Sequence, residues 1–397
     1  MPSRAQRRRR TIRRRRAVAV SLLVLLVAGV SVAASDEDRQ RARRGAASAV
    51  SGPPGQQAPH PPGTRAGARL GSATAWLAPG SDPSVLPGPV LIADRDNNRL
   101  LEVDPRGRII WRFPAPGDLA SGQTFRVPDD AFFSPDGRRV IATQEDDQVI
   151  SVIDPAGGRI VYRYGHPGEA GVEAGYAHNP DDALLMPSGD ILTADIMNCR
   201  LLVIRPPRHR PLWQLGATGT CEHRPGVSFG SPNGAFPAAG SRTVVTEING
   251  NWVDVLAPNG RTLLSVHPPR FSYPSDTNEL RPGVLLSVDY ESPGAIETFT
   301  STGRLLWRYA PGGARALDHP SLALPLPNGD VLANDDRNHR VIVVDPRTNR
   351  VVWQYGHTGV AGSSPGYLSN PDGVDLTPPY SLAMRFAGTM TAPAPLR

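Results

Sequence analysis

The sequence predicts an all-β fold, a six-bladed β-propeller preceded by an N-terminal transmembrane or signal helix and a disordered linker. Three observations carry this: a repeat of roughly 40 to 50 residues beginning near residue 90, a basic and then apolar N-terminus, and a Pro/Gly-rich stretch between them. We assign residues 1–34 to a cytoplasmic basic tail plus membrane anchor or signal peptide, 35–70 to the linker and 71–397 to the propeller.

The charge of the chain lies in its N-terminal part. Residues 1–16 hold nine arginines and no acid, and residues 35–70 hold six arginines against three acids, which leaves −6 for residues 71–397 from a total of +6. A nucleic-acid binder needs its cations clustered on the folded surface. We therefore expect no nucleic-acid partner.

The uncharged run of 18 residues from Ala17 to Ala34 follows the arginines directly. Such a run can just cross the ~30 Å hydrocarbon core as a helix, which predicts a single-pass anchor. The small residues Val32, Ala33 and Ala34 instead permit signal cleavage and secretion. In both cases the arginines keep the N-terminus cytoplasmic and place the propeller outside the cytoplasm.

Residues 35–70 are rich in Ala, Gly, Pro, Ser and Arg. This composition cannot bury enough apolar surface to offset the ordering of the chain, so we expect a disordered spacer.

From residue 90 onward three cues recur in fixed order. A Pro followed by small or acidic residues opens an apolar strand, at Pro128, Pro180, Pro232, Pro274, Pro320 and Pro371. Two strands then flank a polar loop, as in VLIADRDNNRLLEVD (90–104), ILTADIMNCRLLVI (191–204) and VLANDDRNHRVIVVD (331–345). A further strand carries an aromatic residue, at Trp111, Tyr162, Trp213, Trp307 and Trp353. Four antiparallel strands at this period indicate a propeller blade.

Counting the strand pairs gives six blades, beginning near residues 90, 139, 190, 242, 283 and 330. The first blade lacks a Pro-led strand of its own. Residues 371–376 supply one in the right phase, so we expect them to close the ring. Residues 74–77 are the alternative inner strand.

These repeats resemble the NHL and quinoprotein-like repeat propellers over about residues 90–376. The resemblance implies a six-bladed ring but no single function, because this fold hosts binding modules, lyases, hydrolases and sulfotransferases. We interpret the recurring aromatic residues as contacts between blades rather than as a ligand-stacking site. Residues 318–332, DHPSLALPLPNGDVL, also resemble a strand of bacterial arylsulfotransferases.

The loop-rich face of the ring carries the candidate metal site. Oxygen-bearing side chains open the inner strands at Asp129, Asp130, Asp181, Asp182, Asn233, Asp276, Asn278 and Asp372. Hard cations prefer such ligands, so Asp130, Asp182, Asn233, Asp276 and Asp372 are candidate Ca²⁺ ligands. Propeller hydrolases and lactonases of the NHL-like kind, which these repeats resemble, hold calcium at this place. The alternative is that each Asp or Asn only caps the start of its strand.

Histidines near the same long loops are the candidate catalytic residues. His178 and His319 lie just before the inner-strand Pro of blades three and six, and His357 follows Tyr355-Gly356. A facing imidazole pair could supply a nucleophile and a base, or bind a transition metal. The alternative is an exposed or locally hydrogen-bonded imidazole.

The two cysteines, Cys199 and Cys221, fall in neighbouring loops of blade three and face an oxidising compartment, so we expect a disulfide rather than two free thiols.

The leading hypothesis for function is an exported, membrane-tethered propeller that binds a small ligand or an extracytoplasmic protein through its loop-rich face. The alternative is an extracytoplasmic enzyme, either a calcium-dependent hydrolase or lyase, or an arylsulfotransferase-like enzyme.

Overall fold

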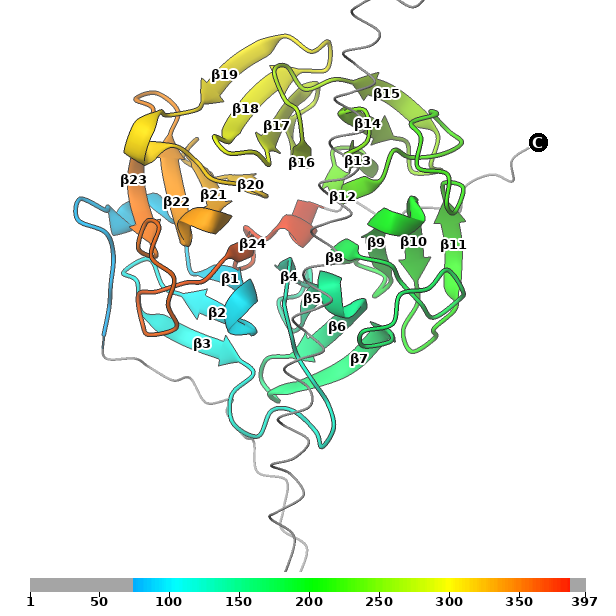
Figure 1. The fold of residues 1–397 in the computed structure, drawn as a ribbon, viewed down its shortest axis with the longest axis horizontal. Coiled ribbons are helices and arrows are strands. Elements are labelled where there is room, and N and C mark those ends of the chain that lie inside the picture. The colour runs from blue at the N-terminus through cyan, green and yellow to red at the C-terminus, as the bar shows by residue number, and fades with distance from the viewer. Residues whose placement is uncertain (1–73, 386–397) are drawn as a thin grey trace, which may run out of the picture. The chain divides into compact units, whose positions relative to one another are not determined.

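A computed structural model describes residues 74–385, and these form six four-stranded antiparallel sheets around a central axis. Figure 1 looks along that axis and shows the sheets as six blades of a ring. The six-bladed all-β propeller predicted from the repeats is therefore confirmed. The anchor or signal segment and the linker lie outside the described residues. Among the residues described, no helix is long and apolar enough to span a bilayer.

The strands of each blade are given from the axis outward. Blade one holds β24 (Pro371–Leu376), β1 (Val90–Asp94), β2 (Arg99–Val103) and β3 (Ile109–Phe113). Blade two holds β4 (Ala131–Phe133), β5 (Val140–Gln144), β6 (Val149–Asp154) and β7 (Arg159–Gly165). Blade three holds β8 (Pro180–Leu185), β9 (Ile191–Asp195), β10 (Arg200–Ile204) and β11 (Pro211–Leu215).

Blade four holds β12 (Pro232–Ala238), β13 (Arg242–Glu247), β14 (Trp252–Leu256) and β15 (Thr262–Val266). Blade five holds β16 (Pro274–Arg281), β17 (Val284–Asp289), β18 (Ala295–Thr300) and β19 (Leu305–Tyr309). Blade six holds β20 (Ala323–Pro325), β21 (Val331–Asp335), β22 (Arg340–Asp345) and β23 (Arg350–Tyr355). Short 3₁₀ helices are η1 (Pro83–Val85), η2 (Arg95–Asn97), η3 (Glu145–Asp147), η4 (Ile196–Asn198), η5 (Gly313–Arg315), η6 (Asp336–Asn338) and η7 (Leu382–Arg385).

The C-terminal strand closes the ring, as predicted. β24 pairs with β1, and Val374 lies opposite Ile92 in the antiparallel register. Residues 74–77 form no strand; instead the Trp76 N–H donates to the carbonyl of Gly107, in the turn between β2 and β3. The alternative that assigned the inner strand to residues 74–77 is wrong, because β24 already occupies that place.

The aromatic residues of the outer strands contact neighbouring blades, as interpreted from the sequence. The Trp353 indole N–H donates to the Pro105 carbonyl of blade one at 2.9 Å. The Trp307 indole N–H donates to Asn349 Oδ1 of blade six at 2.7 Å. Because these rings are packed between sheets, they hold adjacent blades in register.

One ion pair recurs in three blades and locks the polar loop between the second and third strands. An Asp ending the second strand faces an Arg starting the third at 2.7 Å, in the pairs Asp94–Arg99, Asp195–Arg200 and Asp335–Arg340. Each of these Asp side chains also accepts a backbone N–H from the long loop that precedes its blade's inner strand, the donors being Ser369, His178 and Asp318. Each buried carboxylate is thus fully paired within its own repeat.

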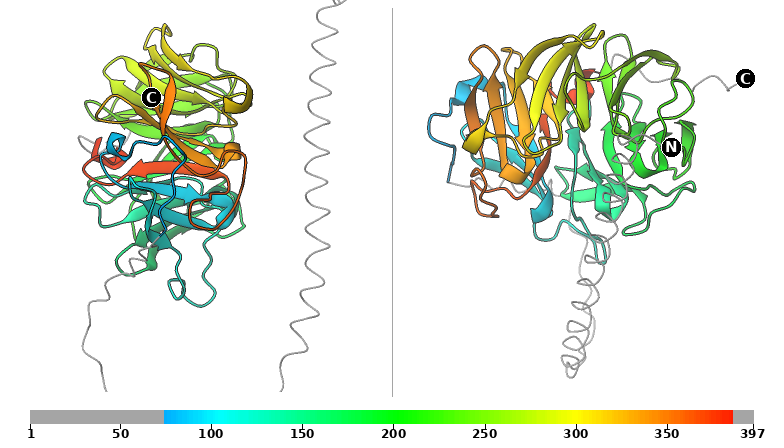
Figure 2. Two further views of the ribbon diagram at one scale, coloured as in Figure 1. Left: turned by 90° about the vertical axis from the view of Figure 1, so that its left-hand side faces the viewer. Right: turned by 45° about the horizontal axis from the view of Figure 1, so that its top comes forward.

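The two faces of the ring differ, as Figure 2 shows edge-on. The 3₁₀ helices η2, η3, η4 and η6 and the long loops before the inner strands lie on one face, which we call the loop face. The chain leaves β24 on the opposite face, where η7 packs against β4 and β12. On the loop face Cys199 and Cys221 form the predicted disulfide, with their Cα atoms 5.1 Å apart.

Candidate functional site

A cavity of about 380 Å³ lies where the six inner strands begin, on the loop face. All six blades contribute to its wall. Its lining residues are Arg95, Asp129, Asp130, Glu145, Asp181, Ile196, Met197, Asn233, Ile248, Tyr273, Ser275, Asp276, Tyr290, Ser321, Arg337, Asn370 and Asp372. We call it the mouth. Six carboxylates against two arginines make it strongly acidic.

Four carboxylates converge where the mouth meets the inner strands, and three of them line it. We call them the Asp cluster: Asp130, Asp181, Asp182 and Asp276. One oxygen of each lies within 4.8 Å of one oxygen of every other, and all four residues are buried. They meet because each opens the innermost strand of its blade, in Pro-Asp-Asp before β4 and at the start of β8, and in Pro-Ser-Asp at the start of β16.

The Asp cluster is under-satisfied. Asp182 Oδ2 accepts the Ala235 N–H at 3.3 Å, and Asp181 Oδ2 accepts the Asn233 amide at 2.7 Å. One oxygen each of Asp130, Asp182 and Asp276 has no hydrogen-bond partner among the described residues. A buried carboxylate oxygen without a partner costs free energy, so these oxygens favour a bound proton or a bound cation.

The pKa values of the Asp cluster also indicate that it binds either protons or a cation. Burial, followed by the charges of neighbouring carboxylates, raises the pKa values of Asp130, Asp181 and Asp182 well above the usual range. Burial raises the pKa of Asp276 to about 8. Carboxylates this close together cannot all ionise unless a positive charge joins them.

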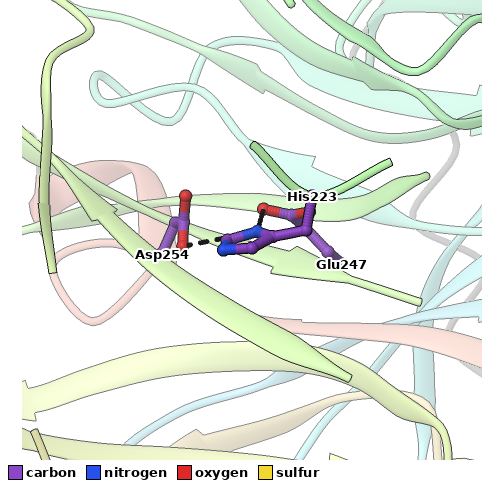
Figure 3. Close-up of side chains that lie close together, drawn as sticks. All are labelled: His223, Glu247 and Asp254. Atoms are coloured by element: carbon purple, nitrogen blue, oxygen red, sulfur yellow. Dashed lines mark hydrogen bonds and ion pairs between the residues drawn. The ribbon is translucent and has the colours of Figure 1, made fainter. Parts of the chain in front are cut away.

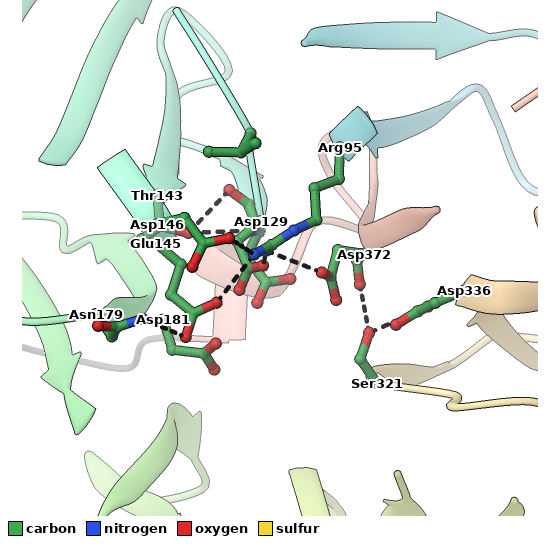
Figure 4. A network of polar contacts seen from close by, with 12 residues as sticks. Arg95, Asp129, Thr143, Glu145, Asp146, Asn179, Asp181, Ser321, Asp336 and Asp372 are labelled. Carbon is green, nitrogen blue, oxygen red and sulfur yellow. Dashed lines mark hydrogen bonds and ion pairs between the residues drawn. The ribbon is translucent and has the colours of Figure 1, made fainter. Parts of the chain in front are cut away.

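Arg95 neutralises a different part of the mouth. It lies in η2 of blade one and forms ion pairs with Asp129 and Asp372, at 3.1 Å for the latter. It also pairs with Glu145 at 3.2 Å and Asp146 at 2.7 Å in blade two (Figure 4). Arg95 has four carboxylate partners already, and its side chain is only 11% exposed. Burial and the neighbouring carboxylates raise the pKa of Asp181 more than the charge of Arg95 lowers it, so the Asp cluster is only weakly compensated.

Blade six completes the rim beside Asp372. The Ser321 hydroxyl donates to the Asp372 backbone carbonyl at 2.6 Å and lies 3.4 Å from Asp336 Oδ1 (Figure 4). The Asn334 amide donates to the Pro371 carbonyl at 3.1 Å. These contacts fix the start of β24, and with it the carboxylate of Asp372.

The predicted metal ligands therefore divide into two groups. Asp130, Asp182 and Asp276 come together with Asp181, which belongs to the wider set of inner-strand acids but was not among the five candidates. Asn233 lines the same mouth through its bond to Asp181, whereas Asp372 pairs with Arg95. That these residues bind Ca²⁺ stays a prediction.

The three candidate catalytic histidines have different contacts. His178 donates its backbone N–H to Asp195, and His319 Nδ1 lies 2.5 Å from Asp318 Oδ1. The His357 ring packs between Trp76 and Tyr367, with both centroid distances 3.9 Å. None of the three is among the described lining residues of the mouth, and their catalytic role stays a prediction.

Sequence reasoning missed Arg95 and Glu145. Each lies in the polar loop that follows the second strand of its blade. A charged residue in such a loop is usually exposed to solvent, so sequence alone provides no reason to place it in a site. Arg95 meets Asp372 across 277 residues of sequence, so their contact depends on ring closure. The register of the repeat could have predicted the contact of Arg95, because it places residue 95 of blade one beside the inner strand of blade two.

A larger cavity of about 540 Å³ lies at the outer edge between blades five and six. Arg308 and Arg340, in its wall, are already paired with Glu297 and Asp335. The mouth, with its unpartnered oxygens, is the stronger candidate site.

Comparisons with known proteins agree with the fold. A family model described as outer membrane protein assembly factor BamB (PQQ_2) matches residues 198–366, less than half of the chain. A search of curated proteins found no significant match.

Among solved structures, a protein of unknown function from Bacteroides caccae aligns at 16% identity with a TM-score of 0.50, covering 72% of this chain and 98% of that one. The WD40 β-propeller domain of Doa1 aligns at 13% identity with a TM-score of 0.46, covering 67% and 78%. A streptogramin B lyase aligns at 18% identity with a TM-score of 0.42, covering 57% and 67%. The resemblance to arylsulfotransferases stays an expectation. The chain is thus a six-bladed β-propeller whose repeats are similar, over residues 198–366, to those of the BamB family model.

Proposed function

We propose that this chain is an exported, membrane-tethered propeller that holds Ca²⁺ in the Asp cluster and binds a ligand at the mouth above it. The observation that carries the proposal is the convergence of four buried carboxylates within 4.8 Å. Three of them have an oxygen with no hydrogen-bond partner in the described part of the chain. A hard divalent cation supplies the missing positive charge, and carboxylate oxygens are the ligands Ca²⁺ prefers.

The wall of the mouth suits a polar ligand. Tyr273 and Tyr290 lie beside one another in blade five, with ring centroids 5.5 Å apart, and both line the cavity with Asp276. Aromatic faces on strand ends give a ligand apolar contact area, while a cation below them attracts its anionic or hydroxyl groups. A small ligand or a loop of an extracytoplasmic protein fits this description.

Export and tethering rest on the sequence. The arginines before the apolar run of residues 17–34 orient the chain with its propeller outside the cytoplasm. The Cys199–Cys221 disulfide supports an oxidising compartment. Fractionation of the native cells tests the tether: we expect the full chain to stay with the membrane in alkaline carbonate, and release into the soluble fraction would contradict it.

Calcium binding is tested on the purified full-length chain. We expect Ca²⁺ to raise the unfolding temperature after chelation, because an ion at a hundredfold excess over Kd stabilises the native state by about 2.7 kcal/mol. Asp182→Asn should lose this response. Asp136→Asn, in an exposed turn between β4 and β5, should keep it. Equal unfolding temperatures with Ca²⁺ and with chelator would leave strand capping as the role of these acids.

A further inference from the structure

Blade four holds a second cluster of metal-binding side chains, outside the mouth. His223 Nδ1 lies 3.0 Å from Glu247 Oε1 and 3.9 Å from Asp254 Oδ1 (Figure 3). The side chains of Glu247 and Asp254 are 0% and 1% exposed, and that of His223 is 10% exposed. One nitrogen and two carboxylate oxygens thus meet within 4.8 Å in a nearly dry place.

Three other blades balance an acid at the position equivalent to Glu247 with an arginine. By strand register Glu247 takes the position of Asp94, Asp195 and Asp335, whose partners across the hairpin are arginines. In blade five the acid, Asp289, lies opposite Ala295 and accepts the backbone N–H groups of Ser272 and Tyr273 instead. In blade four the residue opposite Glu247 is Trp252. Blade four therefore keeps the carboxylate of this ion pair, in Glu247, but has Trp252 in place of the arginine.

Asp254 also differs from the residues at the equivalent position in other blades. Blades one and three place the buried apolar residues Leu101 and Leu202 there. Blade five places Glu297 there, and that acid pairs with Arg308 on the outer strand. Asp254 instead faces Ser265 across the sheet, and within residues 74–385 neither of its oxygens has a hydrogen-bond partner.

The chain holds these groups in place before any ion arrives. The His223 ring stacks on Trp252 with centroids 4.2 Å apart. The Gly230 N–H donates to Glu247 Oε2, which directs Oε1 toward the imidazole. Gly230 permits this approach, since a Cβ there would clash with the Asn249 carbonyl oxygen. The disulfide of Cys221 anchors the loop two residues before His223.

We propose that His223, Glu247 and Asp254 bind one divalent transition-metal ion, best fitted by Zn²⁺. Zinc takes an imidazole nitrogen and carboxylate oxygens at about 2.0–2.2 Å and leaves a fourth position for water. An imidazole ligand selects against Ca²⁺, which keeps this site distinct in chemistry from the Asp cluster.

The test is zinc titration of the purified, chelator-treated full-length chain by calorimetry, with millimolar Ca²⁺ present to occupy the mouth. We expect one Zn²⁺ per chain, and at least a hundredfold weaker binding in both His223→Gln and Asp254→Leu. The leucine is the residue of blades one and three at this position, so this variant should fold even if His223→Gln does not. X-ray absorption at the zinc edge should show one imidazole ligand in the wild type.

Two controls separate this site from others. His319→Gln removes a histidine beside Asp318 and should leave zinc binding unchanged. Asp276→Asn alters the Asp cluster and should also leave it unchanged, so a failure of calcium binding is distinguishable from a failure here. Zinc binding that is absent from the wild type, or that survives both His223→Gln and Asp254→Leu, overturns the proposal.

Discussion

Asp375 of the closing strand accepts the backbone N–H of Phe133 in blade two, with Oδ2 2.9 Å from the nitrogen. Its other oxygen accepts the N–H groups of Leu376 and Leu382, each at 2.9 Å. One fully buried side chain therefore joins β24, β4 and η7 at the end of the channel opposite the mouth.

We expect Asp375→Ala to destabilise the protein strongly. The substitution leaves three backbone donors unpartnered, and each buried unsatisfied group costs about 1–3 kcal/mol, so a loss of 3 kcal/mol or more is reasonable. Chemical denaturation measures it. Asp136→Ala, in an exposed turn, is the matched control, and an equal small loss in both variants would contradict a structural role for Asp375.

The same residue gives a pH dependence with a defined sign. Burial raises the pKa of Asp375 to about 7, against three backbone hydrogen bonds that lower it, while an unfolded Asp titrates near ~3.9. The folded state therefore binds the proton more tightly. The stability due to this group is full below pH ~4 and falls as the pH rises toward about 7.

Asp375→Asn isolates this contribution. Denaturation curves between about pH 5 and 7 should show stability falling less steeply with pH in the variant than in the wild type, by up to ~1.4 kcal/mol per pH unit. Other buried acids are common to both proteins and cancel in the comparison. Parallel curves would mean that the carboxyl group of Asp375 is ionised throughout this range.

A third prediction concerns Arg95. Arg95→Met keeps much of the side-chain volume but leaves the buried carboxylate of Asp129 and the partly buried one of Asp372 without their cation, which should cost about 3–5 kcal/mol. The deficit should shrink at lower pH, because protonation removes the uncompensated charge. Arg138→Met changes an arginine that is 83% exposed and should have little effect. A loss that does not depend on pH would point to packing rather than to charge.

The ring and the acidic mouth were predictable because their signals are local and repeated. Pro-Asp-Asp before an apolar strand occurs in two successive blades at the same phase, so topology alone brings Asp130 and Asp182 to one end of the channel. The disulfide was predictable because Cys199 and Cys221 fall in neighbouring loops of blade three on the same face of the ring.

The blade-four cluster was not predicted because it breaks the repeat. His223 arrives from the exit loop of blade three, and Glu247 and Asp254 come from two strands of blade four, so no spacing links them. The available signal was a substitution within the repeat: Trp252 stands where Arg99, Arg200 and Arg340 stand in other blades. Blade five also keeps both acids without this arginine, at Asp289 and Glu297, but there Arg308 pairs with Glu297. Among the described residues, blade four instead places His223 beside its two acids.

The last prediction is that the disulfide stabilises both the fold and the loop that carries His223. Cys199→Ser/Cys221→Ser removes a cross-link between residues 22 apart, worth about 3 kcal/mol in the chain-entropy model. Denaturation of the variant should show this loss, and reducing the wild type should reproduce it, because both break the same bond. Zinc affinity should fall in the variant while the calcium response of the mouth is unchanged, since the loop anchors His223 and not the Asp cluster. A variant that is less stable while reduction leaves the wild type unaffected would assign the loss to the buried Cys199 side chain instead.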